Sequence, residues 1–324
     1  MGTLQKTMSN PWTPDQMPSC RDKTVLITGA NSGLGFEATK AFAARGATVI
    51  MACRSLDRGE RAAHEIASQL DGSAGGTLTV RECDLASLDS VRSFAEGVRA
   101  AYDELHILCN NAGVMAIPRS ETADGFEMQL GVNHLGHFAL TGLLLDRILD
   151  TDGETRIVTH ASAAHSAGEM NFDDLQREES YGKWEAYGQS KLANLLFAYE
   201  LNRLLRAAGH DTQSVACHPG YADTNLQFRG AKEADSRLQY GLMRLANTVF
   251  GQSPEGGVRP LLYAATAPDV VSGGYYGPDG FLSMRGAPER QESNAASHDQ
   301  DDAETLWAVS EELTGVRYEM LEIA

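Results

Sequence analysis

Long apolar runs are missing from this sequence, and cysteine and lysine are scarce. No stretch approaches eighteen uninterrupted apolar residues, and the first twenty residues are polar and contain proline, so neither a membrane-spanning helix nor a secretory leader is expected. The 5 cysteines are widely spaced and odd in number, which argues against a disulfide framework or a zinc knuckle and predicts reduced, buried thiols. Together these absences predict a cytoplasmic protein.

Positive charge is also in short supply. The chain has 27 lysines and arginines against 44 acidic residues, a net charge of -17, and lysine occupies only 6 of the 27 basic positions. This balance argues against nucleic-acid or anionic-membrane partners, which attract a basic face. Sparing use of lysine beside abundant acid suggests a surface adapted to high salt, with an ordinary acidic protein as the open alternative.

The 324 residues, 42% of them hydrophobic, can fill the core of one large α/β domain. Residues 1–22 have too few apolar groups for an element and are expected to form an N-terminal arm. From residue 23, strands and helices alternate, which predicts a single Rossmann-type doubly wound parallel sheet with helices on both faces. Expected strands cover 24–28, 48–53, 78–83, 107–109, 156–159, 214–217 and 274–276, and expected helices cover 33–44, 56–70, 88–102, 126–149, 185–208 and 255–266.

Two segments depart from this alternation. Residues 221–252 carry several large apolar side chains with no strand to cover, and we interpret them as a small helical lid over a substrate pocket. No linker divides residues 23–285, so they are expected to form one domain that includes the lid. Residues 286–324 are interpreted as a C-terminal extension, polar at first and then apolar at helical spacing, which predicts a short docked helix.

The stretch from Thr28 to Gly35 has glycine at positions 29, 33 and 35, between an apolar strand and a helix. Gly29 suits a tight turn, Gly33 lets the backbone approach a ligand, and Gly35 allows the helix to pack closely on the strand. Free amides and the helix dipole favour an anion there, so the stretch predicts a pyrophosphate site. The motif alone leaves an ordinary strand-to-helix loop open.

Arg54 ends the second expected strand, where no carboxylate is present to take a ribose 2′-hydroxyl. A planar guanidinium pairs well with a phosphate, so Arg54 favours NADP(H) as the cofactor, with NAD(H) as the other possibility. A surface arginine without a ligand is the alternative. In that case the preference would reside at Asn31, Ser32 or Arg58.

Tyr187 and Lys191 stand four apart in an expected helix and therefore share one face. The lysine charge is expected to lower the phenol pKa from about 10, so that Tyr187 can donate and accept a proton. Ser162 follows the expected strand 156–159, at the sheet edge where α/β folds bind ligands, and its hydroxyl can donate to a carbonyl oxygen. Asn133 lies inside an expected helix, where asparagine often kinks the helix or holds a water.

In this order the residues resemble the classical short-chain dehydrogenase/reductase family, over most of residues 23–285. Residues 131–138 and 190–194 are similar to its retinol-dehydrogenase branch and the microbial relatives of that branch. Two departures are His160-Ala161, where Val-Ser is usual, and Phe36, where some relatives carry a basic residue. The motifs that carry the resemblance are the glycine stretch, Asn110-Asn111-Ala112-Gly113, Asn133, Ser162, Tyr187-x-x-x-Lys191 and Pro219-Gly220.

The resemblance implies a role for each of four residues. Tyr187 is implied to be the acid/base and Ser162 to orient and polarise a carbonyl. Lys191 is implied to lower the tyrosine pKa and bind the nicotinamide ribose, and Asn133 to anchor a water in a proton relay. The cofactor-binding residues expected from the motifs and the resemblance are Gly29, Asn31, Ser32, Gly33, Leu34, Gly35, Arg54, Asp84, Leu85, Asn110, Asn111, Ala112, Gly113, Tyr187, Lys191, Pro219, Gly220, Ala222 and Thr224.

The predicted function is hydride transfer between NADP(H) and a small-molecule carbonyl or alcohol. The apolar residues of the expected lid favour a hydrophobic substrate. An NAD(P)-dependent epimerase or dehydratase is disfavoured by the glycine spacing, and a nucleotide-sensing regulator by the intact set of four site residues. His134 and His137 have no third ligand at metal spacing, so no metal is expected. The resemblance suggests a homodimer or homotetramer.

Overall fold

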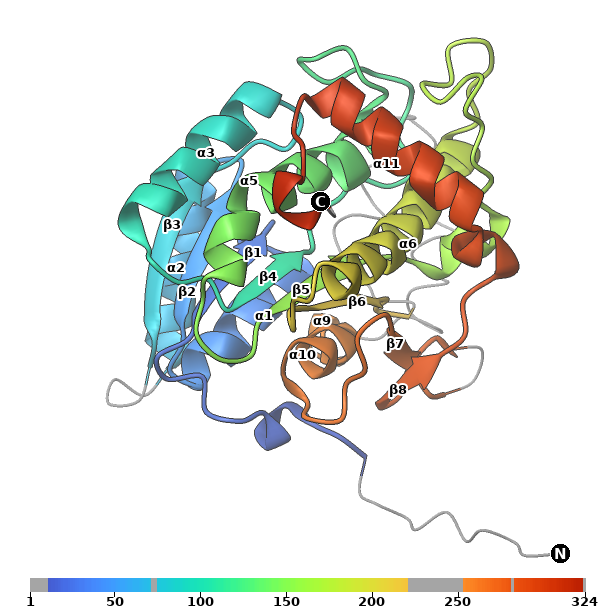
Figure 1. Cartoon of the computed structure of the whole chain (residues 1–324). Coiled ribbons are helices and arrows are strands. Elements are labelled where there is room, and N and C mark those ends of the chain that lie inside the picture. Colours follow the sequence, from blue (N-terminus) through green and yellow to red (C-terminus); the bar gives the residue numbers. More distant parts are fainter. Residues whose placement is uncertain (1–10, 71–74, 221–252, 281–282, 323–324) are drawn as a thin grey trace, which may run out of the picture.

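The computed structural model describes residues 11–70, 75–220, 253–280 and 283–322. Its centre is an eight-stranded sheet in the order β3-β2-β1-β4-β5-β6-β7-β8 (Figure 1), parallel throughout except for the antiparallel pair β7 and β8. The strand order reverses between β1 and β4, where a doubly wound sheet forms its ligand crevice. The strands are β1 Thr24–Thr28, β2 Thr48–Cys53, β3 Thr77–Glu82, β4 Ile107–Asn110, β5 Arg156–His160, β6 Gln213–Cys217, β7 Tyr275–Pro278 and β8 Pro288–Gln291.

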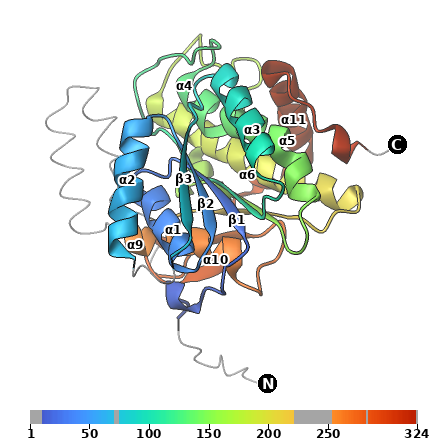
Figure 2. The ribbon, with the colours of Figure 1, turned by 90° about the vertical axis from the view of Figure 1, so that its left-hand side faces the viewer.

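Helices cover both faces of the sheet, as the view in Figure 2 shows. On one face α1 Gly33–Ala44, α2 Leu56–Gln69 and α10 Arg259–Thr266 share a core, and on the other α3 Leu88–Ala101, α5 Gly136–Leu149 and α6 Lys183–Ala207 do. Helix α11 Gln300–Thr314 lies against α5 and α6. The shorter helices are η1 Pro14–Gln16, α4 Met128–Leu130, η3 Ala163–Ala167, α9 Pro254–Gly257, η5 Ala295–His298 and η6 Glu319–Leu321.

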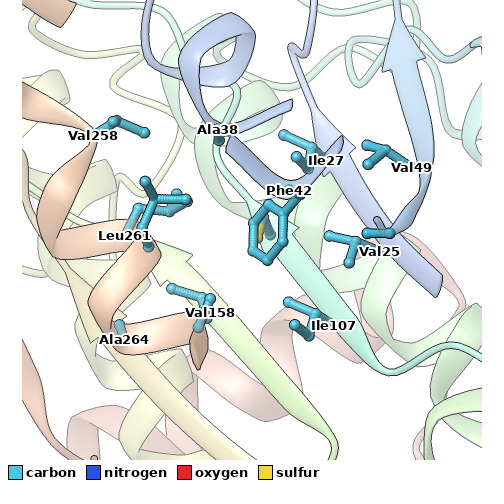
Figure 3. Packing of buried hydrophobic residues seen from close by; sticks show 14 of the residues in the cluster. Val25, Ile27, Ala38, Phe42, Val49, Ile107, Val158, Val258, Leu261 and Ala264 are labelled. Carbon is cyan, nitrogen blue, oxygen red and sulfur yellow. The ribbon is translucent and has the colours of Figure 1, made fainter. Parts of the chain in front are cut away.

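The two cores follow from the alternation of side chains along buried parallel strands. Val25 and Ile27 of β1 pack towards α1, where Phe42 lies against them (Figure 3), whereas Leu26 between them belongs to the opposite core. Burial of each such side chain stabilises the fold by about 1.5 to 3 kcal/mol. This double burial holds the carboxyl ends of the central strands, and the turns that follow them, in fixed positions.

The structure confirms the predicted doubly wound sheet and the docked C-terminal helix, with element bounds within a few residues of those expected. All five cysteines are free and buried, as predicted. Among the described residues, no helix combines the length and the apolar content needed to cross a membrane. The predicted lid, residues 221–252, lies outside the described part of the chain.

Three features differ from the expected elements. The helix expected over 126–149 is divided into α4, a π-helical turn Gly131–Leu135 and α5, and the helix expected over 255–266 is divided at Val258 into α9 and α10. Strand β8 was not predicted and adds an antiparallel edge beyond β7. Its Glu289 and Arg290 are exposed, so no apolar pattern marks this strand in the sequence.

Candidate active site

The glycine stretch forms the turn between β1 and α1. Gly29 and Gly33 have φ angles of 66° and 55°, a left-handed conformation that glycine adopts without strain. A Cβ on Gly35 would lie 2.3 Å from the carbonyl oxygen of Gly29, so glycine is required where the helix begins against the turn. The three glycines therefore shape a turn whose backbone stays open to a ligand at the start of α1.

Thr28 ties the end of β1 to the turn that follows β4. Its Oγ1 accepts hydrogen bonds of 2.9 Å from the backbone N–H groups of Asn111 and Ala112. The Asn111 side chain in turn donates a 2.8 Å hydrogen bond to the Thr28 carbonyl. The two turns thus form one unit at the point where the strand order reverses.

A cleft of about 600 Å³ opens beside this unit, a volume typical of small-molecule sites. It brings together residues from the β1–α1 turn and from the ends of β2, β3 and β4, which are far apart in the sequence. The predicted cofactor-binding residues that line it are Gly29, Asn31, Ser32, Gly33, Leu34, Gly35, Arg54, Asp84, Leu85, Asn111, Ala112 and Gly113.

Three exposed arginines line the same cleft. Arg54 follows β2, and Arg58 and Arg61 lie three residues apart on α2. Arg61 was not among the predicted site residues. The spacing on one helix face could have identified it, because residues three apart in a helix are neighbours. The cleft therefore has a cationic end at the carboxyl edge of β2, formed by three arginines, and Glu65 of α2 also lines the cleft.

Ser162, Tyr187 and Lys191 meet where β5 ends and α6 begins. The Ser162 hydroxyl hydrogen-bonds to the phenol of Tyr187. The Nζ atom of Lys191 lies 5.8 Å from the centre of the Tyr187 ring and donates a 3.0 Å hydrogen bond to the carbonyl of His160. Tyr187 and Lys191 are each only 5% exposed, so the phenol and the ammonium face each other in a largely dry environment.

Burial sets the protonation of this group. It raises the pKa of Tyr187 to about 12, and the hydrogen bond with Ser162 offsets part of that rise. Burial also lowers the pKa of Lys191 to about 8. The expected lowering of the phenol pKa by Lys191 is not seen in this structure, where desolvation raises that pKa and Ser162 is the group that lowers it. At neutral pH Tyr187 therefore carries its proton.

Asn133 lies in the π-helical turn, so the helix is irregular at the residue where either a kink or a bound water was expected. Its Oδ1 accepts a 2.8 Å hydrogen bond from the Val114 N–H. Its Nδ2 donates to the Val114 carbonyl at 3.0 Å and to Ser190 Oγ at 2.9 Å. The side chain of Asn133 therefore holds the turn after β4 against α6.

Some predicted cofactor residues lie elsewhere. Asn110 does not line the cleft, and its Nδ2 donates a 3.0 Å hydrogen bond to Thr141 of α5, because successive strand residues point to opposite faces. Pro219 and Gly220 follow β6 but do not line the cleft, and Gly220 has a φ angle of 68°. Ala222 and Thr224 lie outside the described residues.

Buried histidines surround the site without forming a metal centre. His134 contacts Ser310 Oγ at 2.8 Å, and His137 contacts Thr28 and Asn133. Burial lowers the pKa of both histidines, to about 3 for His134 and about 4 for His137. Within the described ranges, no group of three histidine, cysteine or acidic residues is arranged to hold a metal ion.

The sequence matches the family model of the short chain dehydrogenase over residues 23–234. Retinol dehydrogenase 14 from Mus musculus is 42% identical over 303 residues, which are 91% of this chain and 86% of that protein. Retinol dehydrogenase 12 from Homo sapiens is 42% identical over 299 residues, which are 92% of this chain and 88% of that protein.

Solved structures agree with this assignment. The crystal structure of an uncharacterized protein from Mycobacterium Paratuberculosis is 41% identical, with a TM-score of 0.77 over 95% of this chain and 99% of that chain. A structure from Beutenbergia cavernae, assigned as an NAD(P)-dependent gluconate 5-dehydrogenase with bound NADP, is 26% identical, with a TM-score of 0.58 over 76% of this chain and 91% of that chain. The chain therefore belongs to the short-chain dehydrogenase family, and it is an NAD(P)-binding oxidoreductase that acts on CH–OH groups.

Proposed function

We propose that the chain transfers hydride between NADP(H) and a hydrophobic carbonyl or alcohol, with Tyr187, Ser162, Lys191 and Asn133 as its reaction site. The observation that carries the proposal is the hydrogen bond between Ser162 and the protonated phenol of Tyr187, with the Lys191 ammonium beside the ring. Two hydroxyl groups that meet at one point can both donate to a single carbonyl oxygen, which is where negative charge develops during reduction.

The residues present fit a nicotinamide dinucleotide. The glycine turn leaves backbone N–H groups at the start of α1 for a pyrophosphate. Gly113 connects the cleft to the reaction site, since a Cβ at this position would lie 3.0 Å from Asn133 Oδ1 and 3.7 Å from Lys191 Nζ. When bound, the nicotinamide supplies or accepts the hydride at the substrate carbon.

The proposed preference for NADP(H) rests on the cationic end of the cleft. Arg54, Arg58 and Arg61 offer three guanidinium groups to a 2′-phosphate, and β2 ends without the carboxylate that would bind a ribose 2′-hydroxyl. The structure from Beutenbergia cavernae, described as NAD(P) dependent, contains NADP at low occupancy, in agreement with NADP(H) as a cofactor here.

In the reduction, Tyr187 donates its proton to the carbonyl oxygen while Ser162 donates a hydrogen bond to the same oxygen. Lys191 then stabilises the remaining phenolate, because its ammonium lies beside the ring. The His160 carbonyl holds Lys191 in this position. A phenol pKa of about 12 keeps Tyr187 protonated at neutral pH, so the phenol carries the proton that reduction requires.

A hydrophobic substrate is supported by Trp184, which lies one helical turn before Tyr187 on α6. Its side chain is 47% exposed, although it is large and apolar. Its ring meets the Tyr187 ring edge to face, with centroids 6.2 Å apart, so it can contact the body of a substrate whose carbonyl lies at Tyr187. The relatives named for retinol act on an apolar alcohol, in agreement with such a contact.

We further propose that the protein is a cytoplasmic enzyme without nucleic-acid or membrane partners, that its acidic surface is suited to high salt, and that it forms a homodimer or homotetramer. Helix α11 limits which surface can form a subunit interface, because it covers α5 and α6 through Leu306 and Trp307. Self-association would therefore use α11 itself or a different surface.

The epimerase or dehydratase and the nucleotide-sensing regulator are not favoured. A panel of aldehydes and ketones, tested with NADPH and with NADH at low and high salt, examines the proposed function directly. Consumption of NADPH with alcohol formation would support it. Tight NADPH binding without turnover of any carbonyl would instead favour the regulator.

A further inference from the structure

His137 connects two parts of the site that the proposed mechanism does not join. It lies in the first turn of α5, directly after the π-helical turn, and is 2% exposed. Its Nδ1 lies 3.0 Å from the carbonyl oxygen of Asn133, and its Nε2 lies 2.8 Å from Oγ1 of Thr28. Thus one buried ring spans from the helix that carries Asn133 to the end of β1.

The partners of His137 determine where its proton resides. A carbonyl oxygen can only accept, so Nδ1 must carry the proton that bonds to Asn133. A neutral ring then has an acceptor at Nε2, and Thr28 must donate to it. Thr28 suits this role because Oγ1 already accepts from the N–H groups of Asn111 and Ala112. Its own proton has two acceptors within reach, and His137 Nε2 at 2.8 Å is closer than the Cys109 carbonyl at 3.3 Å.

The ring is also kept neutral by its surroundings. Burial lowers the pKa of His137 to about 4, and the charge of Lys191 acts in the same direction. The other groups that interact electrostatically with His137, namely His134 and His160, are neutral as well because burial lowers each pKa to about 3. The Nδ1–H tautomer is therefore the form present at neutral pH.

We propose that His137 is a positioning residue for the carbonyl reduction: Thr28 holds it in the Nδ1–H tautomer, and its Nδ1–H fixes the direction of the Asn133 backbone carbonyl. The side chain of Asn133 is occupied by Val114 and Ser190. The relay water that the family resemblance implies at Asn133 would have this backbone carbonyl as an acceptor, and the Nδ1–H of His137 holds that oxygen in place. The effect on turnover rests on the proposed function, whereas the tautomer does not.

The test compares two variants of similar shape that differ in one donor. His137→Asn returns an amide N–H near the position of Nδ1, whereas His137→Leu removes the donor and keeps the branched outline. We expect His137→Leu to lower kcat by about tenfold, the value of one hydrogen bond, while KM and the Kd for NADPH change by less than about threefold. His137→Asn should recover most of the lost kcat.

His134→Leu is the matched control, since His134 is an equally buried histidine on the same helical segment that contacts Ser310 of α11 instead. It should lower the melting temperature without lowering kcat, because it removes the buried hydrogen bond to Ser310 and leaves the contacts of His137 with Thr28 and Asn133 in place. Equal kcat values for His137→Leu and His137→Asn, with both proteins folded, would overturn the proposal.

The ¹⁵N-histidine NMR spectrum of the wild-type protein without cofactor gives a readout that needs no turnover and no variant. We expect the His137 ring to stay neutral, with the proton on Nδ1, from about pH 5 to 8. A proton on Nε2, or titration within that range, would overturn the proposal. A wild-type protein that reduces no carbonyl would refute the proposed function. The tautomer seen by NMR would then still test, independently of activity, whether Thr28 and Asn133 hold His137 as described.

Discussion

Replacement of Arg54 by aspartate tests the proposed cofactor preference. Arg54 lines the cleft at the carboxyl end of β2, where a dinucleotide would present its ribose. The substitution removes a guanidinium donor and places a carboxylate at the same point. We therefore expect Arg54→Asp to weaken NADPH while leaving NADH unchanged or improved, because a carboxylate there can accept from the 2′- and 3′-hydroxyls.

The size of the effect follows from the exposure of Arg54 and from its neighbours. A charge-assisted hydrogen bond contributes about 1.5 to 3 kcal/mol, and about 1.4 kcal/mol corresponds to tenfold in affinity. Because Arg54 is exposed and Arg58 and Arg61 remain in the cleft, the lower end applies, so Arg54→Ala should weaken NADPH about tenfold. The added repulsion in Arg54→Asp should extend the loss to between about tenfold and hundredfold.

Dissociation constants for NADPH and NADH, measured side by side at two salt concentrations, decide this prediction. The wild-type preference should shrink as salt rises, because the contact is a charge pair near the surface. Arg206→Asp, the same change at an exposed position of α6 outside the cleft, is the control and should affect neither cofactor. An equal loss of NADH and NADPH affinity would mean that Arg54 is structural.

Three further predictions concern substrate, pH and salt. Trp184→Ala should raise KM for bulky apolar carbonyls by about tenfold and leave KM for small aldehydes unchanged, whereas Val271→Ala, at another exposed apolar residue, should change neither KM. Equal changes in KM for large and small substrates would contradict the proposed contact. The kcat for reduction should be flat through neutral pH and fall above about pH 8, because Tyr187 stays protonated while Lys191 loses its charge. A decrease in kcat centred near neutral pH would assign the titration to another group. Molar KCl should raise the melting temperature, since screening relieves the repulsion of a net charge of -17, and a flat or falling curve would favour an ordinary acidic protein.

The sequence was sufficient to predict the elements that depend on neighbouring residues alone. The β1 strand, the turn glycines and the start of α1 were predictable, because apolar runs and positive φ angles leave direct traces in residue type. The approach of Ser162 to Tyr187 followed from two positions at the carboxyl edge of a parallel sheet. Asn110 was predicted to bind the cofactor together with Asn111, whereas its side chain hydrogen-bonds to Thr141, a difference that the alternation of strand residues could have indicated.

Other features depend on tertiary contacts that leave no such trace. The π-helical turn is followed by a close tertiary contact at Gly136, where a Cβ would lie 2.6 Å from the carbonyl oxygen of Leu85. The pKa of Tyr187 depends on how completely the fold buries it, which a Tyr-x-x-x-Lys spacing does not reveal. One of the two partners of His137 is Thr28, more than one hundred residues away, so the spacing His-x-x-His indicated packing but not this network.

The central claim is that Tyr187 transfers the proton, and Tyr187→Phe tests it most directly. Turnover of NADPH with a carbonyl substrate and the Kd for NADPH would be measured on the same preparation. The account predicts that turnover is lost while NADPH binding stays near the wild-type value, because the substitution removes one oxygen and leaves the cleft residues in place. Turnover retained by Tyr187→Phe would contradict the mechanism.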